Sequence, residues 1–248
     1  MMRELRLFLT AVQFLTRLPV PALKGFAPEW ITASARYYPL VGQIVGAVSA
    51  LVLVLAAKAW GGALPAVLGV LAGILVTGAF HEDGLGDTAD GLGGGHDKTS
   101  RLAIMKDSRI GTYAALALML AGALKIAALT QLSTALLLIA GHGAARAAAV
   151  IAMAALPYAG DAEAAKYKPV PQGVSAGSVL AALVFAAWPF VAFPLPNIVP
   201  ALACGAVLAL IMALMSRRLI GGVTGDVLGA IEQMFEIGFF LGAVSLWP

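Results

Sequence analysis

Residues 169–216 read PVPQGVSAGSVLAALVFAAWPFVAFPLPNIVPALACGAVLALIMALMS and carry no formal charge over 48 positions. A helix that crosses a bilayer needs about 20 mostly apolar residues, so this run is long enough for two spans. Pro194, Pro196 and Asn197 lie near its middle and supply a break. The run therefore predicts two membrane helices joined by a short turn.

The rest of the chain has the same apolar character. Of its 248 residues, 60% are hydrophobic and 12% are charged, and the mean hydropathy is +0.91. Soluble domains carry roughly 25% charged residues, so the composition argues against a soluble enzyme. The apolar content excludes a disordered chain, and no Lys/Arg-rich run indicates nucleic-acid binding. We therefore predict an all-α, polytopic integral membrane bundle that forms a single domain over residues 1–248.

Further apolar runs give the number of spans. They cover residues 37–57, 59–80, 110–129, 133–156 and 227–246, in addition to the two spans within 169–216. Residues 1–18 carry Arg3 and Arg6, are interrupted by Gln13 and precede no signal-peptide cleavage site. We therefore predict about seven transmembrane helices, preceded by an amphipathic helix in the headgroup region.

The charges divide between the two sides of this layout. Alternating the sides from the N-terminus places thirteen of the 16 basic residues and eleven of the 13 acids on one side. Basic loops are typical of the cytoplasmic side. The five exceptions are Lys58, Lys125, Arg146, Glu232 and Glu236. The asymmetry predicts an active site at the cytoplasmic face of the membrane.

Acids are concentrated in HEDGLGDTADGLGGG, residues 81–95. Asp83, Asp87 and Asp90 are spaced i, i+4, i+7, so they share one face if the second span continues as a helix. With Glu82 they form an all-oxygen ligand set, which suits a hard divalent cation. The alternative is a solvated acidic loop, but that does not explain the flanking glycines, which suggest close backbone approach to a ligand. His81 is a metal ligand, a general base or a capping residue.

Other polar residues on the same side suit a phosphate group. Lys106, Asp107, Ser108 and Arg109 supply two cations, a carboxylate and a hydroxyl. Alternatively, they are a basic membrane anchor. Residues 221–226, GGVTGD, open the last span with Thr224 and Asp226, where a helix N-terminus suits a phosphate. Asp226 completes the metal site or caps the helix.

One predicted substrate-binding residue lies within a span. Arg146 follows His142 by one helical turn in an apolar stretch. An intramembrane arginine is costly and suggests a function. A buried pair with Glu232 or Glu236 explains it equally well. Together with the acids, these residues indicate metal-assisted phosphoryl or phosphodiester chemistry at a membrane surface.

At these residues the chain resembles the cobalamin synthase (adenosylcobinamide-GDP ribazoletransferase) family. The similar segments are HEDGLGDTADGLGGG (81–95), IMKDSRIGTY (104–113), GGVTGDVLGA (221–230), FLTRLPVP (14–21) and YPLVG (38–42). They occur in the family's order across nearly the whole chain. Gly86 stands in place of the expected Ala and Ala114 in place of the expected Gly, and neither is a proposed ligand.

The resemblance implies a Mg²⁺-dependent transferase. Its substrates would be adenosylcobinamide-GDP and α-ribazole or α-ribazole 5′-phosphate, and its products adenosylcobalamin, or its 5′-phosphate, and GMP. The ribose 3′-hydroxyl would attack the phosphate next to the aminopropanol arm. The residues expected to hold the metal are Glu82, Asp83, Asp87 and Asp90. Lys106 and Arg109 would neutralise the pyrophosphate, and His81 or a metal-free carboxylate would take the hydroxyl proton.

Two other classes compete with this interpretation. The CDP-alcohol phosphotransferases perform a similar exchange, but their motif has an arginine where residues 83–89, DGLGDTA, have none. A cation transporter would place acids at mid-membrane on several helices, whereas here they gather on one side. The apolar surface is also compatible with a homo-oligomer.

Overall fold

A computed structural model describes residues 2–23, 27, 29–132, 134–160 and 173–245. Within these ranges the chain is helical, and its one β-type contact is an isolated bridge between Tyr158 and Val223. The predicted all-α class is confirmed. The predictions that involve Lys24, Lys166 and Lys168 lie outside the described residues.

Five helical segments are long and apolar enough to cross a membrane. They are Glu29–Ala56, Thr112–Gln131, Leu136–Ala155, Ile198–Ile220 and Gly225–Ser245. The first comprises α2 (Glu29–Ser34), a short 3₁₀ turn and α3 (Tyr38–Ala56). The others are α7 (Thr112–Gln131), α8 (Leu136–Ala155), most of α10 (Leu195–Ile220) and α11 (Gly225–Ser245).

The predicted second span is broken. Helix α4 (Leu64–Thr77) ends at Gly78, and α5 (Phe80–Gly94) leaves at 90° to it. Gly78 and Ala79 both have left-handed backbone angles, with φ of 67° and 60°. If α4 and α5 count as one bent span, the total is six. The acidic segment is therefore a separate helix rather than the straight extension of a span.

The number of seven spans is not confirmed. The first half of residues 169–216 forms α9 (Ala176–Ala187) and a 3₁₀ turn, Trp188–Ala192, which together are too short to meet the length of a span. Pro189 and Pro194 lie in and just after this turn, where they shorten the helix.

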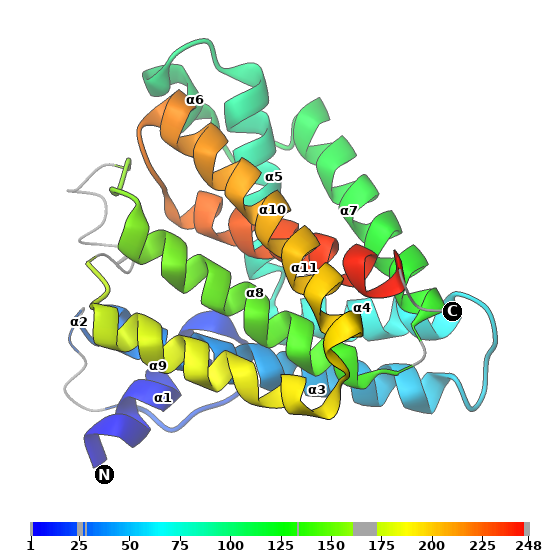
Figure 1. The fold of residues 1–248 in the computed structure, drawn as a ribbon. Coiled ribbons are helices and arrows are strands. Elements are labelled where there is room, and N and C mark those ends of the chain that lie inside the picture. The colour runs from blue at the N-terminus through cyan, green and yellow to red at the C-terminus, as the bar shows by residue number, and fades with distance from the viewer. Residues whose placement is uncertain (1, 24–26, 28, 133, 161–172, 246–248) are drawn as a thin grey trace.

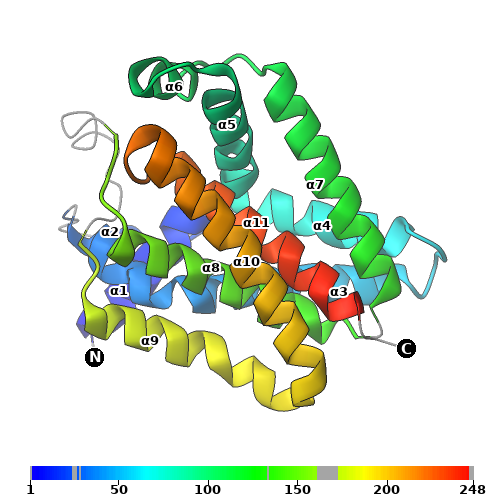
Figure 2. The same cartoon turned by 45° about the horizontal axis from the view of Figure 1, so that its top comes forward.

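Helices α8 and α11 lie at the centre of the bundle (Figures 1 and 2). Most of their side chains are buried, whereas α7 and α10 expose leucine, valine and methionine side chains, as expected next to lipid. Small residues allow the closest contacts. A Cβ on Gly238 of α11 would lie 2.5 Å from the carbonyl oxygen of Cys204 in α10, and one on Gly46 of α3 would lie 2.5 Å from that of Leu138 in α8.

The N-terminal helix is present as predicted, as α1 (Met2–Leu15). Leu7, Ala11 and Leu15 are buried, and Phe14 stacks on Tyr38 of α3. The apolar face of α1 thus packs on the protein, and its place in the headgroup region stays a prediction.

Segments that the charge pattern assigns to one side come together. Helix α6 (Lys98–Ile104) contacts the end of α10, where Arg101 Nη1 donates to the Leu219 carbonyl oxygen at 3.3 Å. The turn after α10 pairs with the segment after α8, since Val223 N–H donates to the Pro157 carbonyl oxygen at 2.9 Å. The segments after α5, α8 and α10 therefore share one end of the bundle.

Candidate active site

The face of α5 that carries Asp83, Asp87 and Asp90 is the first component of the candidate site. Asp83 is exposed, Asp87 is half-buried and Asp90 is 8% exposed. The charges of Asp83, Asp90 and Asp226 all act on the carboxylate of Asp87. The three aspartates lie on one helix, as their spacing predicted. Asp226, in the first turn of α11 (Gly225–Ser245), joins the group.

Glycine brings α5 against α11. A Cβ on Gly84 would lie 2.7 Å from the carbonyl oxygen of Asp226, and one on Gly229 would lie 3.3 Å from that of His81. Gly91 likewise admits α6, because its Cβ would lie 2.9 Å from the Arg101 carbonyl oxygen. The sequence suggested that these glycines allow a ligand to approach the backbone closely. This is wrong for Gly84 and Gly91, because other helices of the protein occupy the space where a Cβ would lie.

Asp90 connects α5 to α7. Its Oδ2 accepts a hydrogen bond from the Gly111 N–H at 2.6 Å, and its Oδ1 accepts one from the Ala114 N–H at 2.9 Å. Both residues lie at the start of α7, where backbone N–H groups have no carbonyl acceptor within the helix. Asp90 therefore anchors the loop between α6 and α7 to the acidic face.

That loop carries the predicted basic group. Lys106, Ser108 and Arg109 are exposed. Arg109 Nε donates to Asp107 Oδ1 at 3.0 Å, and the Arg109 backbone N–H donates to the same oxygen at 3.0 Å. These hydrogen bonds lower the pKa of Asp107 to about 2. Asp107 thus orients Arg109 from within the loop.

The start of α11 has both predicted polar residues. Thr224 is buried, and its Oγ1 accepts a hydrogen bond from the Val227 N–H at 3.2 Å, so Thr224 caps the helix. The same hydroxyl donates to Asp226 Oδ2 at 3.4 Å. The capping role that the sequence left open for Asp226 falls to Thr224.

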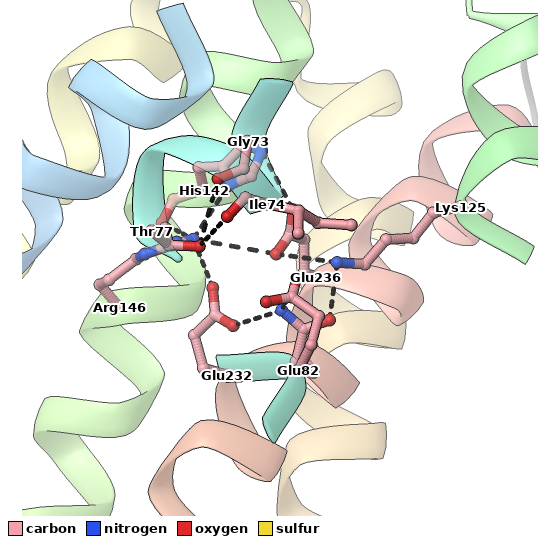
Figure 3. A network of polar contacts seen from close by, with 10 residues as sticks. Gly73, Ile74, Thr77, Glu82, Lys125, His142, Arg146, Glu232 and Glu236 are labelled. Atoms are coloured by element: carbon pink, nitrogen blue, oxygen red, sulfur yellow. Dashed lines mark hydrogen bonds and ion pairs between the residues drawn. The ribbon is translucent and has the colours of Figure 1, made fainter. Parts of the chain in front are cut away.

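Glu82 does not share the aspartate face. Its Oε1 accepts from Gln233 Nε2 of α11 at 3.2 Å, and Gln233 Oε1 accepts from Lys125 Nζ of α7 at 2.7 Å. The side chain points into a buried polar network between α5, α7, α8 and α11 (Figure 3). His81 is also buried, at 4% exposure, with its ring edge-on to Phe80.

The centre of this network contains Arg146, which forms an ion pair with Glu232. Arg146 Nη1 lies 2.9 Å from His142 Nδ1, and His142 Nε2 lies 3.1 Å from Glu236 Oε1. An arginine can only donate, so Nδ1 accepts and the proton of His142 is on Nε2. The structure therefore places Arg146 in the buried pair that the sequence allowed.

Two groups of side chains are candidates for a metal. The ligand atoms of His142, Glu232 and Glu236 lie within 4.8 Å of one another. However, Arg146 Nη1 contacts His142 and Glu232 and lies 3.8 Å from Glu236 Oε2, so the guanidinium already takes the place of a cation. These residues do not fit a metal.

The aspartates fit better, although they are less tightly gathered. Their donors are all carboxylate oxygens, as a hard cation requires. In the part of the chain that the structure describes, neither Asp83 nor Asp87 lies within 4 Å of a lysine or arginine nitrogen. Asp83 and Asp87 are therefore available to such an ion, and Asp226 of α11 lies next to them.

Sequence reasoning missed Lys125 and Gln233 as members of the buried network. The charge of Lys125 inside an apolar span was the feature of the sequence that could have indicated a buried polar partner. Gln233 directly follows Glu232 but carries no formal charge, so the charge pattern did not mark it.

Long apolar helices define a polytopic membrane protein, and within the described residues the acids of α5 and the basic loop after α6 lie toward one end of its bundle. The profile of the cobalamin-5-phosphate synthase family matches residues 7–244. The chain belongs to this family and is an enzyme.

Full-length relatives support the assignment. A Leptothrix cholodnii protein named adenosylcobinamide-GDP ribazoletransferase is 46% identical over 253 residues, which cover 98% of this chain and 96% of that protein. Proteins of the same name from Shewanella amazonensis and Vibrio cholerae are 39% and 37% identical, and cover 99% and 96% of this chain and 97% and 93% of their own lengths. No solved structure matches the chain.

Proposed function

We propose that this enzyme joins adenosylcobinamide-GDP to α-ribazole or α-ribazole 5′-phosphate and releases GMP. The product is adenosylcobalamin or its 5′-phosphate, as formed in the last steps of cobalamin biosynthesis. The name of the relatives supports the substrates. The observation that carries the chemistry is the group formed by Asp83, Asp87 and Asp226, on a helix that Asp90 joins to the end of the basic loop.

Asp83, Asp87 and Asp226 would hold Mg²⁺. Asp90 of α5 was also predicted as a ligand, and this stays a prediction; its hydrogen bonds to the start of α7 support a role in holding that helix. A bound Mg²⁺ neutralises charge on the pyrophosphate and stabilises the leaving phosphate. Glu82 was also predicted as a ligand, and this stays a prediction that the metal titrations below test.

The basic loop would bind the phosphates. Arg109 is oriented by Asp107 and has an 87% exposed side chain, so it can reach a phosphate group without losing a buried contact. Lys106 adds a point charge and Ser108 a hydroxyl donor. Thr224 and the first N–H groups of α11 are placed next to Asp226, where they suit an anionic oxygen.

The ribose 3′-hydroxyl must lose its proton as it attacks the phosphate. His81 is buried beneath Phe80, which favours a carboxylate of the aspartate group as the acceptor. Arg146 was predicted to bind substrate, but its pairing with Glu232 supports a role inside the bundle.

The proposed location is the bacterial cytoplasmic membrane, with the aspartate group on the cytoplasmic face. The convergence of the segments after α5, α8 and α10 supports one polar side. Association into a homo-oligomer stays a prediction.

The test is to incubate membranes that contain the protein with adenosylcobinamide-GDP, α-ribazole and Mg²⁺. We expect cobalamin and GMP in equal amounts, and neither product when EDTA replaces Mg²⁺. Release of CMP from a CDP-alcohol would instead support the phosphotransferase alternative. Ion flux in proteoliposomes without nucleotide turnover would support the transporter.

A further inference from the structure

The aspartate group depends on how α5 lies against α11, since Asp83 and Asp87 come from one helix and Asp226 from the other. Asp226, Gly229 and Gln233 are spaced by three and four residues, so they lie on one face of α11. Asp226 and Gly229 of this face contact α5 at Gly84 and His81. Gln233 makes the third contact, with Glu82.

Gln233 is held in a single orientation. Its side chain is 2% exposed, and Lys125 Nζ donates to its Oε1 at 2.7 Å. An ammonium group cannot accept, so the amide oxygen must face Lys125 and the NH₂ group must face the acids. The NH₂ group donates to Glu82 Oε1 at 3.2 Å and to Glu232 Oε2 at 3.0 Å.

Lys125 is itself fixed. It is 6% exposed, and its Nζ lies 3.3 Å from Glu236 Oε2. The chain of contacts therefore runs from Glu236 through Lys125 and Gln233 to Glu82, across α11, α7 and α5. A buried hydrogen-bonded network of this kind fixes geometry, because leaving any member unpaired is costly.

We infer that Gln233 is a positioning residue: it holds Glu82, and thereby the register of α5 against α11, so that Asp83 and Asp87 face Asp226. Glu82 acts as the anchor of α5 and not as a metal ligand. This inference deepens the proposed function and rests on the aspartate group as its metal site. Replacing a residue that orients a metal ligand without binding the metal typically changes metal affinity by about 10–100-fold.

The register is measured first without metal or substrate. Cys204 is the chain's one cysteine, so a variant with Cys204→Ser, Asp87→Cys and Asp226→Cys carries a single reactive pair. A short bifunctional thiol reagent should cross-link this pair. Gln233→Leu should lower the yield by roughly threefold, because small misplacements have large effects on reactions between fixed groups.

The matched control is Gln43→Leu. Gln43 is also a buried membrane glutamine with two contacts, to the Phe185 carbonyl oxygen at 2.6 Å and to Trp188 Nε1 at 2.8 Å, but on α3. Its replacement should leave the cross-linking yield unchanged. If Gln233→Leu does not fold, Gln233→Asn keeps the amide while shortening its reach, and gives the same test. An unchanged yield in a folded Gln233 variant would overturn the inference.

Measuring the affinity of the full chain for Mn²⁺ distinguishes an anchoring role of Glu82 from a role as metal ligand. Glu82→Gln keeps an oxygen that accepts from Gln233, so Mn²⁺ affinity should stay close to wild type. Glu82→Leu and Gln233→Leu should each weaken it by about tenfold. Loss of binding in Glu82→Gln with retention in Gln233→Leu would make Glu82 a ligand and refute the inference. A wild-type protein without GMP release would contradict the proposed function alone, because the cross-linking result does not depend on turnover.

Discussion

Asp90 accepts a hydrogen bond from the Gly111 N–H at 2.6 Å, so the last acid of α5 holds the first turn of α7. This contact holds the end of the basic loop, residues 106–109, to the last acid of α5. Asp90→Ala should lower the free energy of unfolding by about 1–2 kcal/mol, as for other lost helix caps. It should also raise KM for adenosylcobinamide-GDP more than it lowers kcat. Thermal unfolding in detergent and steady-state kinetics check the two effects, and an unchanged KM would contradict the placement.

Asp87→Asn should raise the Mg²⁺ concentration for half-maximal activity by at least about tenfold, because the all-oxygen site loses a charge. The change also removes repulsion within the aspartate group, so stability should not fall. The matched control is Asp97→Asn, which alters an exposed acid that caps α6. Equal Mg²⁺ dependence in the two variants would exclude Asp87 as a ligand.

The Asp107–Arg109 contact has a defined pH range. The pKa of Asp107 falls from 3.8 to about 2 because Arg109 bonds the carboxylate. A lowered pKa means that the contact stabilises the loop fully above pH 3.8 and is lost as the pH falls through about 2. The pH–activity profile between pH 5 and 9 should therefore contain no step from Asp107. A step in that range that Asp107→Asn removes would contradict this assignment.

Arg146→Met should be among the most damaging substitutions in the bundle. It leaves Glu232, which is 0% exposed, without its cation. Breaking a buried ion pair from one side costs about 3–5 kcal/mol. The double variant Arg146→Met, Glu232→Met removes both charges and should recover part of the loss in thermal unfolding. A double variant less stable than Arg146→Met would show that Glu232 has further favourable partners.

Gly238→Ala should destabilise the contact between α10 and α11, because the new Cβ would lie 2.5 Å from a backbone oxygen that cannot move aside. Overpacking of this kind costs about 1–3 kcal/mol. Gly122 is the control, since a Cβ on it would meet nothing within 4 Å. Gly122→Ala in α7 should be neutral or stabilising. Similar melting temperatures for the two variants would argue against the close α10–α11 contact.

Sequence periodicity and charge predicted much of the fold. The spacing of Asp83, Asp87 and Asp90 places them on one face if the segment is helical, and α5 is a helix. Apolar length located α7, α8 and α11 to within a few residues. The bend before α5 was not predicted, because hydropathy has no angular information and Ala79 gives no sign of a positive φ.

The site was predicted less completely than the fold. Motifs identified Asp87 and Asp226, which the fold brings together although 139 positions separate them. Glu82 is next to Asp83 in sequence yet points about 100° away from it around the helix, as the helical repeat requires. Its partner Gln233 lies on another helix, and a single sequence does not indicate such a pairing.

The right-angle turn at Gly78 and Ala79 sets the direction in which α5 carries the acids away from α4. A straight helix over residues 64–94 would be about 45 Å long, at 1.5 Å per residue. The hydrocarbon layer is about 30 Å thick, so the aspartates of a straight helix would extend well into the water. The bend instead keeps them against the side of the bundle. If the acids form the proposed site at the cytoplasmic face, we expect a corrinoid and a nucleotide to meet near the lipid headgroups, with protein on one side of the reacting phosphate.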